Sequence, residues 1–147
     1  MRISHDALIL VADGRKSLFL RNEGDADYPN LVVEDQRAQA GLKDRDLKSD
    51  GPGQAMSQGG SGRHSTMEET DYHQQEEDRF AADMAALLAE RAQANGFEQL
   101  IIVAPPRTLG ELRQHYDKAV EARIVAEIDK DLVNHPVDKL EGVLKGL

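Results

Sequence analysis

Two short segments in which every residue is apolar constrain the fold of this 147-residue chain more than any other feature. One covers residues 7–12 (Ala-Leu-Ile-Leu-Val-Ala) and the other covers residues 100–104 (Leu-Ile-Ile-Val-Ala). Both are far shorter than the roughly 20 residues that a membrane-spanning helix needs. A strand that is apolar on both faces has to be covered on both faces. The two segments are therefore predicted to be central strands of a sheet with helices on each side.

Shorter strand patterns follow the first of these segments. The turn signal Asp13-Gly14 precedes an apolar-rich stretch at residues 17–20, and a turn-rich stretch then leads to Leu-Val-Val at residues 31–33. Three short strands with tight connections predict an antiparallel meander.

Three segments have the apolar spacing of a helix. The longest is predicted to begin at Thr70 or Asp71, either of which suits the N-cap position, and to end at Asn95-Gly96. A short helix should follow Pro105-Pro106, and a final helix should follow Pro136. The apolar positions are Phe80, Met84, Leu87 and Leu88 in the longest helix, Leu109, Leu112 and Tyr116 in the short one, and Val137, Leu140, Val143 and Leu144 in the last.

Residues 41–72 are predicted to form a long loop between the third strand and the first helix. The apolar signal vanishes there, and five glycines fall between Gly51 and Gly62. Such a segment buries too little apolar surface to offset its ordering entropy, so we expect it to be mobile when free. Loops of this length inside a compact domain are usually functional sites or disordered inserts.

Residues 123–129 alternate between apolar and polar, as an outer strand would, and we expect Ile124, Ala126 and Ile128 on one face. The last two strands are joined through a helix, which predicts a parallel pair with a right-handed crossover. A five-stranded mixed sheet of order 3-2-1-4-5 satisfies these constraints. The prediction is therefore a single α/β domain over residues 1–147, with helices on both faces and a ribonuclease H-like arrangement.

Composition excludes several classes of function. The chain has 18 Lys+Arg against 27 Asp+Glu, a net charge of -9, which argues against broad binding to phosphate backbones. It has no cysteine, which excludes disulfides, thiolate nucleophiles and cysteine-ligated metals. The first residues lack a signal-peptide pattern and no segment could span a membrane, so we expect a cytoplasmic protein with no membrane contact.

Two constellations could carry chemistry. Asp13, Glu77 and Asp129 could ligate the metals of a two-metal nuclease, but Asp13-Gly14 equally reads as a hairpin turn, Glu77 as a helix-surface charge and Asp129 as a strand-end residue. His73 and Glu77 are spaced i, i+4 and could hold a divalent metal with His64, or simply form a His–Glu hydrogen bond. The plain interpretations are favoured, so we predict no catalytic residue, no metal and no cofactor.

Several segments carry a resemblance to a known family. They are Gly62-Arg63-His64, Asp71-Tyr72-His73, and residues 77–81, 103–113 and 127–132. Over essentially the whole chain they resemble the bacterial family named for attachment to host cells. That family is similar to the middle domain of eukaryotic and archaeal release factors and of Pelota-type rescue factors. The resemblance implies a ribonuclease H-like fold with a long loop between the third strand and the first long helix.

In the release factors that this family resembles, the corresponding loop ends in a Gly-Gly-Gln tip, which positions a water at the peptidyl-transferase centre. The corresponding loop here contains Gly51-Pro52-Gly53-Gln54, and Gln58-Gly59-Gly60 with the order reversed. Pro52 fixes a backbone angle where the family uses a permissive glycine, so we expect no peptide release.

The sequence therefore predicts a non-catalytic binding protein of the host-attachment family, associated weakly with the ribosome or RNA. The alternative is a hydrolase, either a metal-dependent nuclease or a degenerate peptidyl-tRNA hydrolase. The sequence identifies no protein partner and no oligomeric state. The candidate binding residues are Gln54, Arg63, His64, His73, Arg107 and Arg113.

Overall fold

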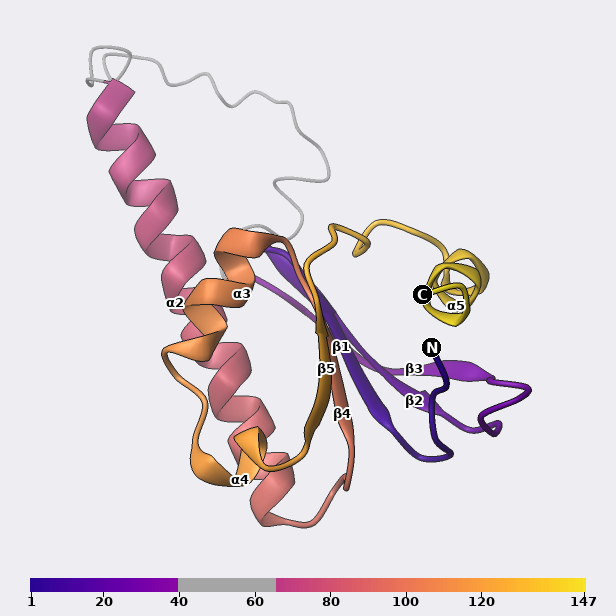
Figure 1. The fold of residues 1–147 in the computed structure, drawn as a ribbon. Coiled ribbons are helices and arrows are strands. Elements are labelled where there is room, and N and C mark those ends of the chain that lie inside the picture. The colour runs from indigo at the N-terminus through magenta and orange to yellow at the C-terminus, as the bar shows by residue number, and fades with distance from the viewer. Residues whose placement is uncertain (40–65) are drawn as a thin grey trace.

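The computed structural model (Figure 1) describes residues 1–39 and 66–147, with side chains from residue 71 in the second range. Within these ranges the chain forms five strands and four helices. In chain order they are β1 (Leu8–Ala12), β2 (Lys16–Asn22), β3 (Leu31–Ala38), α2 (Thr66–Gln93), β4 (Leu100–Val103), α3 (Pro106–Arg113), α4 (Lys118–Glu121), β5 (Ile124–Ile128) and α5 (Val137–Lys145).

The five strands form one mixed sheet of order β3-β2-β1-β4-β5, which confirms the predicted order. β1, β2 and β3 pair antiparallel, as the predicted meander requires. β4 pairs parallel with both β1 and β5. The two fully apolar segments are thus neighbours at the centre of the sheet.

Helices cover both faces of this sheet, as predicted. α2, α3 and α4 lie on one side and α5 lies on the other (Figure 1). Leu8, Leu10 and Ile102 point into the core beneath α2. Their neighbours Ile9 and Ile101 point into the second core, beneath α5. The alternation of each strand thus supplies both cores.

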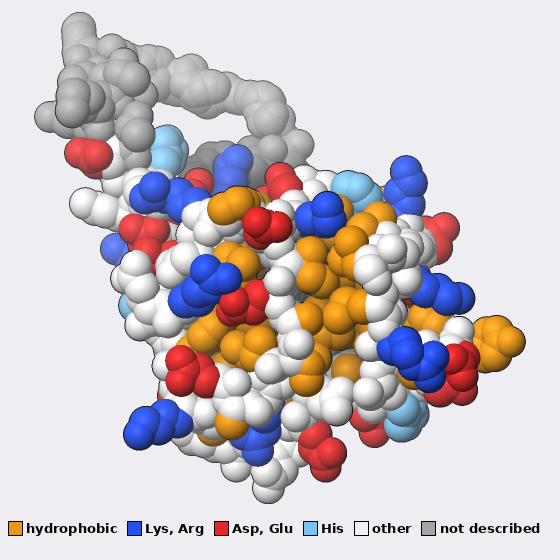
Figure 2. All heavy atoms as spheres, viewed as in Figure 1, with side chains coloured by type: hydrophobic (Ala, Val, Ile, Leu, Met, Phe, Trp, Pro, Cys, Tyr) orange, Lys and Arg blue, Asp and Glu red, His pale blue; other side chains and the backbone are white. Residues whose placement is uncertain are grey.

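α5 is only nine residues long and leaves part of its face of the sheet uncovered. Figure 2 shows apolar side chains gathered on the surface beside α5. Ala126, Ile128, Val137 and Val143 pack against the second core but are only partly buried. In the described part of the chain, the helices lack the continuous apolar length that crossing a bilayer requires.

The predicted facing of β5 was wrong at one residue. A register shift separates the pair Leu100–Ile124 from the pair Ile101–Ala126, so Val125 is an extra residue in β5. This bulge turns Ile124 toward the core beneath α2, whereas Ala126 and Ile128 pack against the other core. Val125 itself is 54% exposed.

The predicted start of the long helix was also wrong, because α2 begins at Thr66 rather than at Thr70 or Asp71. Residues 66–72 of the predicted loop over 41–72 are therefore helical, and residues 41–65 lie outside the described residues. From Thr66 to Gln93 the sequence contains neither glycine nor proline, so nothing interrupts the helix before Asp71. At the other end Asn95 is left-handed (φ 57°), and Gly96 N–H donates to the Arg91 carbonyl (2.7 Å), which closes the helix as predicted.

The remaining elements differ from prediction in length. β3 runs to Ala38, because its polar second half still pairs with β2. α3 ends at Arg113, so Tyr116 lies beyond it, and the chain then forms the unpredicted α4. Asp117 caps α4 by accepting a hydrogen bond from the Val120 N–H (2.9 Å).

Asn22 joins the N-terminal segment to the β2–β3 connection. It is completely buried. Its Nδ2 donates to the Ile3 carbonyl (2.8 Å), and its Oδ1 accepts from the N–H groups of Gly24 and Asn30 (2.9 Å each). The sequence showed only a turn-rich stretch here, yet one buried amide side chain satisfies backbone groups of both segments.

We predict that Asn22→Ala lowers the free energy of unfolding by about 2–4 kcal/mol, because it removes the partners of one buried and two partly buried backbone groups. Denaturant unfolding measures the change. Asn134→Ala, at an exposed position, is the matched control and should change stability by less than about 0.5 kcal/mol. Equal effects of the two variants would show that the Asn22 hydrogen bonds contribute nothing.

Candidate functional site

The N-terminal part of α2 projects past the end of the sheet (Figure 1). Glu77 is the residue at which α2 meets the β1–β2 turn, since a Cβ placed on Gly14 would lie 2.7 Å from its Cδ, Cγ and Oε1. Eleven residues precede Glu77 in the helix. At 1.5 Å per residue they extend about 16 Å beyond this contact. We call residues 66–76 the α2 arm.

The base of the α2 arm is built by the β1–β2 hairpin. Asp13 Oδ1 accepts hydrogen bonds from the N–H groups of Arg15 (2.8 Å) and Lys16 (2.9 Å). The end of β3 is tied to the same turn, because Gln39 N–H donates to the Arg15 carbonyl (2.8 Å) and its Nε2 to the Gly14 carbonyl (3.1 Å). The chain therefore leaves β3 beside the base of the α2 arm.

The three acidic residues considered for a metal site, Asp13, Glu77 and Asp129, have different surroundings in the structure. Asp13 is the turn residue of the hairpin, and Glu77 packs against Gly14. Asp129 follows β5 and is exposed. Among the described residues no three His, Asp or Glu side chains are grouped to share a metal ion. The carboxylate set of a two-metal nuclease is therefore not assembled in this part of the chain.

His73 lies on the α2 arm and is exposed. Its ring packs edge-on against Tyr72, with centroids 5.8 Å apart. Within the described residues it makes no hydrogen bond to Glu77, whose side chain is turned toward Gly14. The i, i+4 spacing places His73 and Glu77 on one helix face, but the Glu77 side chain packs against Gly14 in the β1–β2 turn.

The two predicted arginines of the second half differ in their surroundings. Arg113 at the end of α3 donates from Nε (2.9 Å) and Nη2 (2.7 Å) to Glu127 on β5, which raises the Arg113 pKa. Tyr116 Oη donates to the same carboxylate (3.1 Å). Burial and the Glu127 charge raise the pKa of Tyr116 well above its usual range. Arg113 therefore holds α3 to β5.

Arg107, in the first turn of α3, is exposed and has no hydrogen bond or ion pair within the described residues. It follows Pro105-Pro106 at the end of β4. The carboxyl ends of the parallel strands β1 and β4 share one edge of the sheet, so Arg107 lies at the same end of the molecule as the α2 arm. Gln54, Arg63 and His64 lie outside the described residues.

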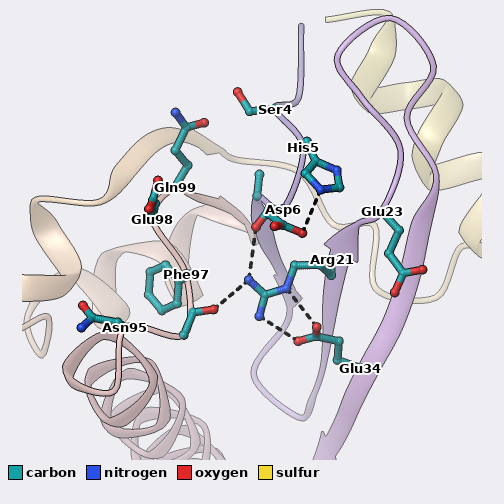
Figure 3. A pocket seen from close by; sticks show the side chains of 12 residues that line it. Ser4, His5, Asp6, Arg21, Glu23, Glu34, Asn95, Phe97, Glu98 and Gln99 are labelled. Atoms are coloured by element: carbon teal, nitrogen blue, oxygen red, sulfur yellow. Dashed lines mark hydrogen bonds and ion pairs between the residues drawn. The ribbon is translucent and has the colours of Figure 1, made fainter.

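The opposite end of the sheet holds a polar cavity of about 740 Å³ (Figure 3). Arg21 lies at its centre, with its side chain 15% exposed. Nη1 donates to the carbonyls of Asp6 (3.1 Å) and Gly96 (2.8 Å), while Nε and Nη2 donate to the two oxygens of Glu34 (2.9 and 3.2 Å). All three guanidinium nitrogens of Arg21 thus donate to groups of the protein itself.

Arg91 completes this ion-pair network from the C-terminal part of α2. Its Nη1 donates to Glu34 Oε1 (3.0 Å), and its guanidinium lies 4.8 Å from the centre of the Phe19 ring. The hydrogen bond from Arg21 and then that from Arg91 outweigh burial and hold the Glu34 pKa below its ordinary value. The network therefore ties β2, β3 and α2 together.

Sequence reasoning missed this network because its members come from three elements. Glu34 is the extra residue of a second bulge, since Phe19 pairs with Asp35 but Leu20 pairs with Val33. Glu34 shares its side of the sheet with Arg21 because it lies two residues after Val32, the partner of Arg21, and the bulge then turns Asp35, opposite Phe19, to that side as well. The sequence does show charged residues within strand-like segments, but that pattern does not identify which charges pair with one another.

The structure thus has a mixed 3-2-1-4-5 sheet, 27 residues between β3 and α2, and a long helix that projects beyond the sheet where these residues rejoin it. The chain belongs to bacterial archaeo-eukaryotic release factor family 12, whose sequence model matches residues 6–144. The predicted kinship with release factors is confirmed, whereas the name for attachment to host cells stays a prediction.

A curated relative is similar over a short segment. Forty-five residues, 31% of this chain, are 42% identical to an uncharacterized protein of Rickettsia prowazekii (strain Madrid E). The segment spans 30% of that protein's length.

We predict that Gly14→Ala lowers the free energy of unfolding by about 1 kcal/mol, because the new methyl group displaces the Glu77 side chain. The φ of Gly14 lies outside the left-handed region that favours glycine, so alanine should be neutral or stabilising there once Glu77→Ala has cleared the space. Chemical denaturation of the two single variants and the double variant gives the coupling. Equal losses in both backgrounds would contradict the contact.

We predict that Glu34→Gln lowers the free energy of unfolding by about 1 kcal/mol at pH 7. Because the folded pKa is lowered, this contribution is present above the unfolded pKa of about 4.3 and is lost as pH falls through the folded value. Denaturant titrations from pH 7 to pH 3 should show the two proteins converging. Glu23→Gln, an exposed residue lining the same cavity, is the control, and a pH-independent difference at Glu34 would refute the assignment.

Proposed function

We propose that this protein is a non-catalytic binding protein that contacts the ribosome or its RNA with the end of the molecule that carries the α2 arm. The observation that carries this proposal is the projection of α2, about 16 Å past its contact with Gly14, beside the point where the chain leaves β3. Membership of a release-factor-related family supports the ribosome as the partner. The ribonuclease H-like classification of the fold belongs to the same proposal.

The non-catalytic part rests on two features. Gly51-Pro52-Gly53-Gln54 stands where the resemblance places a Gly-Gly-Gln tip, and proline restricts its own backbone and that of the preceding residue. The acids of the competing nuclease hypothesis, Asp13, Glu77 and Asp129, are not gathered at one site within the described residues. Neither the proline in the loop nor the separation of these acids prevents binding, because binding needs only a surface that becomes ordered against its partner.

Charge sets the expected strength of this contact. A net charge of -9 opposes approach to RNA, so few cations must offset the repulsion. Arg107 is exposed at the arm end of the molecule, and Arg63 is the sequence candidate from the inserted segment. We infer weak, strongly salt-dependent binding in the cytoplasm, and any role in attachment to host cells would be indirect.

Sedimentation of the purified protein with ribosomes tests the proposal. We predict weak co-sedimentation at about 50 mM salt that disappears at about 200 mM, because each phosphate contact releases counterions. Arg107→Ala and Arg63→Ala should each reduce the bound fraction several-fold, since a charge-assisted hydrogen bond to phosphate is lost. Lys139→Ala, an exposed cation on α5, makes the same charge change away from the α2 arm and should leave binding unchanged.

Three results would contradict this function. Absence of co-sedimentation at low salt would remove the ribosome as a partner. Release of peptidyl-tRNA that Gln54→Ala abolishes would establish release chemistry. Cleavage of RNA in Mg²⁺ or Mn²⁺ that Asp13→Asn abolishes would establish the alternative, a metal-dependent hydrolase.

A further inference from the structure

A groove of about 350 Å³ lies between the end of β3 and the flank of α2. Arg37 and Ala38 form one wall, and the other wall consists of α2 residues. Those residues are Phe80, Asp83, Met84, Ala86, Leu87 and Glu90. Phe80 and Met84 are nearly buried at its floor, whereas Leu87 is half-buried and Ala86 is exposed. The groove is thus apolar below and charged along its rim.

Among the described residues, the helical layer stops short of β3, which leaves the groove. The core beneath α2 takes side chains from β1, β2 and β4, such as Leu10, Phe19 and Ile102. No residue of β3 belongs to that core. On this side β3 instead carries Asp35 and Arg37, which pair with each other (3.0 Å). A second element lying beside α2 above β3 would complete the layer.

The edge of β3 does not suit an added strand. Its Leu31 N–H donates to Glu141 Oε2 (2.8 Å) and its Gln36 N–H donates to Asp35 Oδ1 (2.8 Å). The bulge at Glu34 interrupts the ladder between them. Capped donors, charged side chains and bulges are the devices by which sheet edges avoid pairing. An occupant of the groove is therefore expected to be helical.

The α2 wall has the spacing that packs against a helix. Phe80, Met84 and Leu87 recur at i, i+4 and i+7, so the two floor residues and the half-buried Leu87 follow one another along the groove. Asp83 and Glu90 are seven residues apart, about 10.5 Å along the axis. Neither has a hydrogen bond or ion pair within the described residues. The carboxylates of Asp83 and Glu90 are thus spaced to pair with two Lys or Arg side chains that lie two turns apart on a neighbouring helix.

We propose that this groove binds an amphipathic helix of a partner protein. The helix places two or three apolar side chains over Phe80, Met84 and Leu87, and its Lys or Arg residues, two turns apart, face Asp83 and Glu90. This is recognition of a helix in a groove by i, i+4 and i+7 anchors. It goes beyond the ribosome contact and does not depend on it, because the groove lies on the flank of α2 and not on the α2 arm.

A synthetic helical peptide tests this inference. It has about 18 residues, or five helical turns, with Leu along one face and Lys residues two turns apart beside that face. A peptide of the same composition in scrambled order is the control. Fluorescence anisotropy with the labelled peptides should show binding of the amphipathic peptide alone. Side-chain NMR shifts should be concentrated at Phe80, Met84 and Leu87.

Variants separate the groove from general charge attraction. The double variant Asp83→Asn, Glu90→Gln should weaken binding about five- to tenfold, since it removes two ion pairs. Ala86→Arg, at an exposed helix position that tolerates arginine, should abolish binding without unfolding the protein. The double variant Glu98→Gln, Asp138→Asn removes the same charge elsewhere and should change affinity less than twofold.

Any of three results would overturn the inference. The first is no binding at about 1 mM peptide, the weak end of specific association. The second is equal binding of the scrambled peptide, or equal weakening by the two double variants, which would mean attraction by net charge alone. The third is a concentration-dependent dimer in light scattering that Ala86→Arg abolishes, which would assign the groove to a second copy of this chain.

Discussion

The structure depends on the parallel pairing of β1 with β4. Leu8, Leu10, Leu100 and Ile102 project to one face, and the alternating residues between them project to the other. All are at most 1% exposed. Because both faces are apolar, one layer of helices cannot bury the pair, and α2 and α5 must lie on opposite sides. The antiparallel and parallel neighbours, β2 and β5, then satisfy the outer backbone groups.

This constraint explains how far the sequence predicts the fold. Apolar runs and helical stripes depend on burial, so they identified the central strands, α2 and the order of the sheet. The bulges at Val125 and Glu34 arise from the register with a partner strand, which a single segment does not encode. The facing of Ile124 was therefore wrong, and the facing of Asp35 and Arg37, which follow the second bulge, could not be derived.

The candidate site was less predictable for the same reason. Spacing placed His73 and Glu77 on one helix face, but the β1–β2 turn beside α2 decides where the Glu77 side chain lies. Arg113 was a sequence candidate for binding because of its segment, yet Glu127, fourteen positions away, engages it. Local chemistry names candidate residues, whereas distant elements decide which remain available to a partner.

The two proposed contacts, of the α2 arm with RNA and of the groove with a partner helix, differ in how many charged side chains remain free for the partner. Most of the arginines in the described part of the chain are engaged internally. Arg21 and Arg91 bind Glu34, Arg113 binds Glu127, and Arg123 donates to the Phe97 and Ala119 carbonyls. The positive charge left for RNA is thus smaller than composition indicates, and contact through the α2 arm must be sensitive to salt. Asp83 and Glu90, in contrast, have no internal partner in the described part of the chain and border apolar surface. Burial of that surface does not weaken with salt, so a basic amphipathic helix should retain more of its affinity than RNA does as ionic strength rises.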